Sequence, residues 1–409
     1  MKRNYVTLTF LAASLSIMAM QNTVNVNVEN NSTLSRKAVP VIIKLANYDI
    51  NVKSALVSKS GTEIPSQLDD LNGDGVYDEL CFMTDIDKKA KQTFTVTLSD
   101  SGKPREYKSQ VYAEMLMTNK KIKSNNKQNL YISSLTVDNG TNPYWMLHHH
   151  GPAFENDMVA YRIYFDHRQT VDIYGKYHKG LELKQTQFYP SKEQKAAGFG
   201  DDVLWVGETM GLGTLRGWNG NKPEMLVDVD SRTLRIVSRG PLRTIVEVID
   251  KGWNTMNSGK EKIDMVTRYT LYAGRRDCFV DIDFTRQVPD YMFATGIINV
   301  KNSVEMSDKK GLRGCWGTDW PVSEKDSAGH KRETVGLGIY ISTKNIIKEL
   351  PADKDNYPYV IGNATDELHY NITFCSDNED FGFHSSNEWF DYLKAWKKEL
   401  ENPVTIKIQ

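Results

Sequence analysis

Residues 160–176 of the chain read AYRIYFDHRQTVDIYGK, and this stretch indicates the fold. Two runs, 160–166 and 171–176, alternate apolar and polar side chains around the turn 167–170, which predicts a β-hairpin. One face of the hairpin is then a core face, made of Tyr161, Ile163, Phe165, Val171 and Ile173. The other face combines aromatic side chains with both signs of charge: Arg162, Tyr164, Asp166, Asp172, Tyr174 and Lys176. A sugar-binding sheet surface needs this mixture; the alternative is a solvated outer face with two ordinary tyrosines.

Short strands of this kind recur along the chain. Because no helices intervene between them, they indicate antiparallel sheets and a large β-sandwich, so the predicted class is all-β. We expect the strands at 129–136, 159–176, 203–209, 224–228, 232–239, 243–251, 262–273, 277–286, 293–300, 335–342, 369–375 and 403–409. A helix is predicted over 387–400, where Ser385 and Glu388 fit a capping box, and a shorter one over 191–197.

The 409 residues exceed one ordinary domain. Residues 22–103 predict a small N-terminal β domain, a charged and turn-rich linker follows, and 110–409 predict the large β-sandwich. Residues 1–20 have the form of a signal peptide, with Lys2 and Arg3 before an apolar run too short to span a bilayer comfortably. We therefore expect an exported protein, located in the periplasm of a Gram-negative bacterium, with no membrane span.

The charge and the cysteines limit the partners of the protein. The formal net charge is −1, and the absence of a basic arm or tail argues against nucleic acid or anionic lipid as a partner. The four cysteines lack CxxC spacing, which argues against a zinc site. In an oxidising compartment they form at most one disulfide or remain as buried thiols.

Residues 70–78 read DLNGDGVYD and fit the calcium-loop spacing DxNxDGxxD. The predicted Ca²⁺ ligands are Asp70, Asn72, Asp74, Asp78 and the main-chain carbonyl of Val76. An EF-hand has glutamate at position twelve, where this chain has Cys81, and the flanks read as strands rather than helices. We expect an EF-hand-like loop within a β-hairpin, with a structural ion; the alternative is a metal-free turn.

Three consecutive histidines, 148–150, follow the aromatic pair Tyr144-Trp145. Gly151-Pro152 ends any regular element, so we place the histidines at a strand end or in a loop, where functional sites tend to lie. Three interpretations stay open. His148 and His150 bind a metal with Glu155 or Asp157, one neutral imidazole acts in acid/base chemistry, or the run has no chemical role.

Two further segments carry candidate substrate-binding residues, in addition to Trp145. Asp201 and Asp202 directly precede the predicted strand 203–209, although plain turn chemistry explains them equally well. Trp316, Asp319 and Trp320 fall in a predicted loop at 314–321. This loop is either a sugar-stacking wall or a loop anchored by its own aromatic side chains.

Three segments together resemble one family: PSQLDDLNGDGVYDELCF (65–82), HHHGPAFENDMVAYRIYFDHRQTVDIYGK (148–176) and GDDVLWVGE (200–208). The chain is similar to an exported bacterial domain-of-unknown-function family found in polysaccharide-utilisation systems, notably beside pectin-degrading enzymes. The likeness covers nearly all of the chain after the signal peptide. It implies a role in glycan breakdown and a β-sandwich related to galactose-mutarotase-like and lyase supersandwiches, but no particular catalytic residues.

The predicted function is that of a carbohydrate-active enzyme acting on uronic-acid-containing oligosaccharides, with β-elimination as the first choice. A lyase must neutralise the uronate carboxylate, remove the C5 proton and protonate the leaving oxygen. The candidates for these three roles are, in order, Arg162 or Lys176, His149 or His150, and Tyr164 or Tyr174. The alternatives are a glycoside hydrolase using carboxylates such as Glu155 and Asp202, a mutarotase-like epimerase, and a non-catalytic glycan-binding protein.

Overall fold

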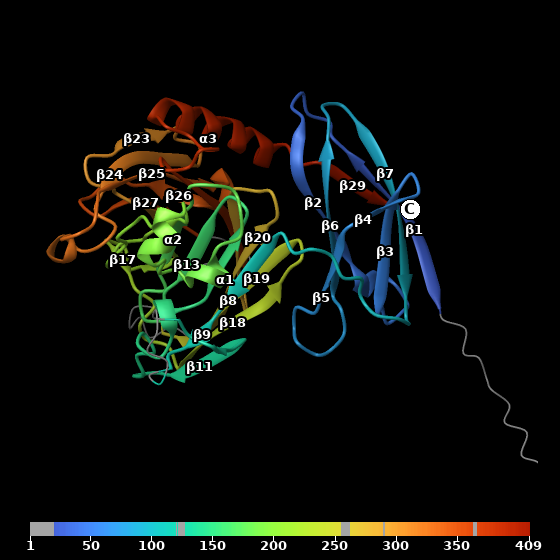
Figure 1. Ribbon diagram of the computed structural model, residues 1–409, viewed down its shortest axis with the longest axis horizontal. Helices are drawn as coiled ribbons and strands as arrows, with labels where there is room; N and C mark the ends of the chain where they lie inside the picture. Colours follow the sequence, from blue (N-terminus) through green and yellow to red (C-terminus); the bar gives the residue numbers. More distant parts are fainter. Residues whose placement is uncertain (1–19, 120, 122–126, 255–261, 289–290, 363–365) are drawn as a thin grey trace, which may run out of the picture.

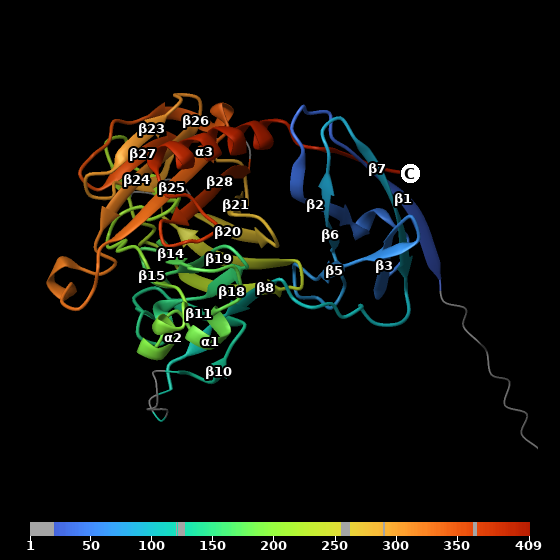
Figure 2. The same ribbon diagram turned by 45° about the horizontal axis from the view of Figure 1, so that its top comes forward.

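The computed structural model describes residues 20–119, 121, 127–254, 262–288, 291–362 and 366–409 (Figure 1). The chain forms antiparallel sheets with few helices, which confirms the predicted all-β class. It folds into a small N-terminal sandwich and a larger domain, which lie side by side in both views (Figures 1 and 2). The predicted signal peptide falls outside the described residues except for its last position.

The small domain packs a five-stranded sheet, in the order β29-β1-β7-β3-β4, against a three-stranded sheet, β2-β6-β5. The two sheets enclose their own apolar core, which includes Val26, Val41, Phe82 and Phe94. The strands are β1 (Gln21–Glu29), β2 (Arg36–Lys44), β3 (Ser54–Lys59), β4 (Thr62–Ile64), β5 (Ser66–Asp69), β6 (Glu79–Ile86), β7 (Lys91–Ser99) and β29 (Thr405–Ile408). β29 pairs with β1 rather than joining the large sandwich, so the C-terminal end of the chain returns to the N-terminal domain.

The large domain has a nine-stranded sheet faced by two five-stranded sheets, with a two-stranded ribbon at one side. One continuous apolar core joins all three sheets. The nine strands are, in order, β11 (Ser134–Asp138), β18 (Ser231–Arg239), β19 (Arg243–Trp253), β20 (Ile263–Tyr272), β21 (Asp277–Phe284), β28 (Glu367–Ser376), β25 (Glu333–Ile341), β24 (Leu312–Asp319) and β23 (Val304–Ser307). The predicted antiparallel sandwich is therefore present.

The two five-stranded sheets cover one face of the nine-stranded sheet, and the ribbon lies at one side. The first five-stranded sheet is β15 (Asp201–Asp202), β14 (Val171–Gly175), β13 (Ala160–Ile163), β12 (Ala153–Asn156) and β8 (Val111–Glu114). The second is β17 (Pro223–Glu224), β16 (Arg216–Trp218), β22 (Phe293–Ile298), β27 (Asn356–Ile361) and β26 (Ile346–Glu349). The ribbon pairs β9 (Leu116–Met117) with β10 (Leu130–Tyr131).

The helices agree with the sequence pattern. α3 (Ser386–Glu401) begins at the N-cap Ser385, whose side chain accepts a hydrogen bond from the Glu388 N–H, as the capping box predicted. It packs Trp389, Leu393 and Trp396 against the nine-stranded sheet. α2 (Lys192–Ala196) has the reciprocal capping box of Ser191 and Gln194. The four-residue α1 (Leu183–Thr186) was not predicted.

Several sequence predictions are wrong. Of the predicted strand 224–228 only Glu224 is in a strand, β17, and the last strand belongs to the small domain. The run 203–209 is not a strand: only Asp201 and Asp202 pair with β14, and the backbone then leaves the sheet and takes positive φ at Gly207 and Gly211. The segment 314–319 is not a loop, because it lies in β24 and pairs along its length with β25. The apolar run 203–209 wrongly suggested a strand, and the glycines near 314–319 wrongly suggested a loop. In both cases the hydrogen-bonding partner decides the structure, and the sequence does not show it.

Buried polar contacts join the two domains. Arg243 of β19 donates to Asp69 and Glu79 of the small domain, both at 2.8 Å. Gln67 donates to the Ser238 hydroxyl at 2.7 Å and accepts from the Leu242 N–H at 2.6 Å. Since these groups are buried and mutually satisfied, they fix the relative position of the domains.

Candidate functional site

The β13–β14 hairpin forms as predicted. Arg162 pairs with Asp172 across the two strands, and the turn is closed by the bond from the Tyr164 N–H to the Thr170 carbonyl at 3.0 Å. Tyr161, Ile163 and Ile173 lie in the main core, as strand parity requires. The polar face, however, is not an open outer surface, because residues 182–189, including α1, lie over it.

Arg162 is the centre of this covered polar face. Its Nη2 contacts Asp172 Oδ2 at 2.6 Å and Asp202 Oδ2 at 2.7 Å, and its Nε donates to Asp172 at 2.9 Å. It also donates to the hydroxyls of Tyr164 and Tyr189, at 2.8 and 3.1 Å. Strands β13, β14 and β15 and the segment that follows α1 thus meet at the guanidinium of Arg162. The Arg162 side chain is 3 % exposed.

The two carboxylates differ in access to solvent. Asp172 is fully buried, whereas the Asp202 side chain is 19 % exposed at the edge of the sheet. Burial, followed by the negative charge of Asp172, raises the pKa of Asp202 well above its usual range, and Arg162 opposes this shift. Burial also raises the pKa of Asp172, and Arg162 opposes this shift too. Of the two carboxyls only Asp202 reaches solvent, so Asp202 is the one placed to act as a general acid.

The histidine run is held tightly against the hairpin. The His150 carbonyl accepts from the Phe165 N–H at 2.8 Å, and a Cβ at Gly151 would lie 1.7 Å from the Ile163 carbonyl oxygen. His149 and His150 take φ values of 43° and 68° in this turn. The glycine is therefore required for the close approach that sets the histidines over the sheet.

His150 lies within an aromatic stack. Its ring is 3.7 Å from that of Tyr144 and nearly parallel to it, and Tyr164 lies parallel at 6.0 Å. The contact of Nδ1 with the Tyr144 carbonyl at 2.9 Å leaves Nε2 as the acceptor of the neutral ring. Burial lowers the pKa of His150 to about 4, so the ring is neutral at pH 7 but a weak base.

His149 is placed away from any reactive position. It is buried, and its Nε2 lies 3.2 Å from Glu114 Oε1. Burial lowers the pKa of His149 to about 3 and raises the pKa of Glu114 to about 8. The pair is therefore a neutral imidazole beside a protonated carboxyl at pH 7, rather than an ion pair.

Three more of the predicted catalytic residues, Glu155, Tyr174 and Lys176, belong to a second buried cluster. Lys176 contacts Glu155 Oε2 at 2.6 Å, and both side chains are fully buried. Glu155 also accepts from the backbone N–H groups of Glu182 and Leu183, and Tyr174 donates to Glu182 at 3.0 Å. This cluster attaches the α1 segment to the sheet, and it leaves neither Lys176 nor Glu155 free to meet a substrate.

Aromatic side chains surround the exposed edge of the site. Trp145 is 77 % exposed and lies edge-on to Tyr144 and His150. Trp205, three residues after Asp202, is 47 % exposed. Such rings offer flat apolar faces to a ligand.

The remaining predicted substrate-binding residues lie elsewhere. Trp316 packs into the cluster beneath α3, and Trp320 carries Arg332 over its ring at 5.2 Å. Asp201 faces away from Asp202, makes an ion pair with Lys195, and lines a groove of about 250 Å³ together with Pro321. The segments around 201 and 321 therefore meet, but Trp316 and Asp319 do not line this groove.

The loop between β5 and β6 has the predicted hairpin context. Asp70 accepts hydrogen bonds from the N–H groups of Gly73 and Gly75, and Asp78 accepts from Leu71. The donor set is oxygen only, as calcium requires. Among the described residues, however, no three His, Cys, Asp or Glu side chains converge where a metal could bind, and this includes the histidine run. Calcium binding therefore stays a prediction.

All four cysteines, Cys81, Cys278, Cys315 and Cys375, are buried free thiols. Of the two possibilities left by the sequence, a disulfide or buried thiols, the structure has the second. None of the described helices is long and apolar enough to cross a membrane.

The family model for the domain of unknown function DUF4861 matches residues 28–406. The chain belongs to this family. No curated protein matches the chain. This DUF4861 member also resembles two solved structures at low identity. One is an alpha-mannosidase from Enterococcus faecalis V583, with a TM-score of 0.49 and 10 % identity over 95 % of this chain and 46 % of that chain.

The other is a protein in glycosyl hydrolase family 38 from Enterococcus faecalis, with a TM-score of 0.49 and 9 % identity over 95 % of this chain and 47 % of that one. The DUF4861 chain spans about half the length of each. A likeness this distant does not indicate which reaction the chain performs.

Sequence reasoning missed two members of the DUF4861 site. Asp172 was placed on the polar face by parity but given no role, although it lies directly across from Arg162. Tyr189 follows the unpredicted α1, and no local pattern links it to the hairpin. The structure gathers Arg162, Tyr164, His150, Trp145 and Asp202 from the predicted set and separates the others from them.

Proposed function

We propose that this DUF4861 protein is a carbohydrate-active enzyme whose catalytic group is Asp202. The observation that carries the proposal is the single guanidinium of Arg162 shared by a buried and a partly exposed carboxylate, at 2.6 and 2.7 Å. Asp172 and Arg162 act as positioning residues, because they set the pKa and the orientation of Asp202 without meeting solvent. The exposed rings of Trp145, which contacts His150, and of Trp205, three residues after Asp202, supply stacking surfaces.

The geometry favours hydrolysis over β-elimination. An eliminating enzyme needs a free cation for the uronate carboxylate, but Arg162 is bound to Asp172 and Asp202, and Lys176 to Glu155. Arg168, which lies over the ring of Tyr164, is likewise paired with Asp166 at 2.6 Å. Hydrolysis instead uses a pair of carboxyl groups, one of them protonated beside the glycosidic oxygen, and Asp202 supplies this acid in the proposal.

In this proposal the Asp202 carboxyl gives its proton to the glycosidic oxygen as the bond from that oxygen to the anomeric carbon breaks. Water adds its hydroxyl to the anomeric carbon, and its second proton returns to the Asp202 carboxylate. Since Asp202 must be protonated at the start, turnover falls as the pH rises through its raised pKa. The negative charge of Asp172 raises that pKa, so Asp172→Asn moves the falling limb to lower pH.

A product screen tests the function. The protein is incubated with neutral plant-type oligosaccharides and with pectin-derived ones that contain the uronic acid expected from the family resemblance, and products are read by mass spectrometry and ultraviolet absorbance. New reducing ends with the mass of added water support hydrolysis. An unsaturated uronate product would establish elimination instead, and an unchanged panel would refute both activities.

A glycan-binding protein without catalysis is the second candidate, favoured by the exposed Trp145 beside Tyr144 and His150. In that case the wild-type protein shows no turnover, and Trp145→Ala weakens saccharide binding. We expect the protein in the periplasm, and its export is checked by fractionation of the producing cell.

A further inference from the structure

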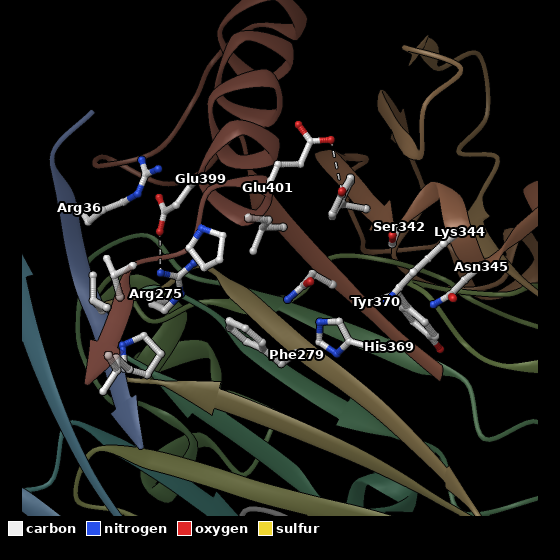
Figure 3. Close-up of a pocket in the computed structure, with 18 of the residues that line it drawn as sticks. Arg36, Arg275, Phe279, Ser342, Lys344, Asn345, His369, Tyr370, Glu399 and Glu401 are labelled. Carbon is white, nitrogen blue, oxygen red and sulfur yellow. Dashed lines mark hydrogen bonds and ion pairs between the residues drawn. The ribbon is translucent and has the colours of Figure 1, made fainter. Parts of the chain in front are cut away.

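A cleft separate from the hairpin lies between the two domains (Figure 3). Its volume is about 910 Å³, near the upper end of the roughly 300–1,000 Å³ of small-molecule sites. The outer face of the nine-stranded sheet forms the floor, and α3 with the segment leading to β29 covers it. β2 of the small domain and residues 342–345 form the sides.

Two buried donors lining this cleft lack a hydrogen-bond partner. Asn371 is 2 % exposed and Arg36 is 3 % exposed, and neither Asn371 Nδ2 nor Arg36 Nε meets an acceptor among the described residues. Arg36 uses its Nη2 for the Asn402 carbonyl at 3.2 Å, which ties the small domain to the end of α3. These two residues therefore contribute buried polar groups to the wall of the cleft.

The floor adds an aromatic surface and a positioned imidazole. Phe279 and Tyr340 stand on either side of Asn371 in the sheet register. His369, two residues before Asn371 on the same face, lies 6.2 Å ring to ring from Phe279. Its Nδ1 contacts Asp281 at 2.6 Å, which fixes the ring and leaves Nε2 for a ligand hydroxyl.

The charges that line the cleft decide the class of ligand. Three cations, Arg36, Arg275 and Lys344, are matched by three carboxylates, Glu367, Glu399 and Glu401. Arg275 and Glu399 already contact each other at 2.8 Å (Figure 3). A formally neutral wall of alternating donors and acceptors with aromatic rings suits a hydroxyl-rich neutral molecule better than an anion.

We propose that the interdomain cleft is a second saccharide site, which binds a neutral oligosaccharide through His369, with Phe279 and Tyr340 as apolar contacts and with Asn371 and Arg36 in its polar wall. The proposal does not depend on chemistry at Asp202. Because both domains line the cleft, a bound oligosaccharide bridges them.

The test is calorimetric titration of the full chain with cellotetraose, xylotetraose, mannotetraose, galactotetraose and trigalacturonate. At least one neutral tetrasaccharide should bind, and Phe279→Ala and His369→Ala should each weaken its affinity at least tenfold. His178→Ala is the matched control, because His178 forms a similar exposed pair with Asp380 at 2.7 Å outside the cleft. It should leave the affinity unchanged.

Three results would overturn the proposal. None of the five probes binds, only trigalacturonate binds, or the affinity for a neutral probe drops in Asp202→Asn but not in His369→Ala. The last result would assign binding to the hairpin site and leave the proposed function standing. His369 is about half exposed, so we expect His369→Ala to fold normally. Lys344→Ala, on the exposed loop at the side of the cleft, is a second cleft variant that should also fold normally.

Discussion

Replacing Arg162 by methionine tests the electrostatic arrangement of the hairpin site most sharply. The change keeps an unbranched apolar side chain but removes the contacts to Asp172 at 2.6 and 2.9 Å and to Asp202 at 2.7 Å. Breaking a buried ion pair on one side costs about 3–5 kcal/mol, because a buried charge loses its partner. Since Asp202 keeps some solvent access, we expect a loss near the lower limit, about 3 kcal/mol at pH 7.5.

The loss should depend on pH in a defined direction. Without Arg162, the pKa values of the two carboxyls rise further, so the folded state holds more protons than the unfolded state. The stability of Arg162→Met therefore improves as the pH falls, and the deficit relative to wild type at pH 5.0 is smaller than at pH 7.5.

Urea unfolding followed by tryptophan fluorescence and circular dichroism at both pH values measures these differences. Arg162→Met/Asp172→Asn should recover part of the loss, because it removes the unpaired charge. Arg105→Met, at an exposed pair with Glu63 of 3.5 Å, should cost less than about 1 kcal/mol. An Arg162→Met deficit below about 1 kcal/mol, or one equal at both pH values, would refute the reasoning.

Three other predictions concern the neighbouring elements. Since burial raises the pKa of Glu114 from 4.5 to about 8, the folded state binds the extra proton between these values and stability falls with rising pH; Glu114→Gln should flatten this fall in thermal unfolding from pH 5 to 8, and an unchanged slope would contradict the assignment. If the 70–78 loop binds calcium, a hundredfold excess over Kd adds ~2.7 kcal/mol of stability, and Asp74→Ala or a chelator abolishes the gain; equal melting temperatures with calcium and with chelator would exclude the site. Trp316→Ala should lower stability by roughly 2 kcal/mol, because the ring packs beneath α3, and leave saccharide affinity unchanged; reduced affinity at full stability would restore its stacking role.

Local periodicity predicted the parts of the fold that depend on neighbours in sequence. The 160–176 hairpin follows from a period of two, and α3 from its cap and apolar stripe. The wrong predictions involve distant partners. The apolar run after Asp202 has no strand to pair with, and the last strand pairs with β1 rather than within the large domain.

The site was predictable to the same extent. Parity placed Arg162, Tyr164 and Asp172 on one face, and the paired Asp201-Asp202 suggested a carboxylate site. Nothing local shows that residues 182–189 cover that face, or that Glu182 and Leu183 donate to Glu155 and so enclose Lys176. Burial of a charged residue is decided by what packs on it, which a single strand does not encode.

The rate of the Asp202→Asn variant tests the central claim most directly. The asparagine keeps the size of the side chain but cannot give up a proton, and Arg162 still pairs with Asp172. On an oligosaccharide that the wild-type protein cleaves, Asp202→Asn should lower kcat by about a hundredfold or more, with a melting temperature close to that of wild type. Asp201→Asn, on the opposite side of the same edge strand, should retain activity. Wild-type turnover by a folded Asp202→Asn would contradict the assignment of Asp202 as the catalytic acid.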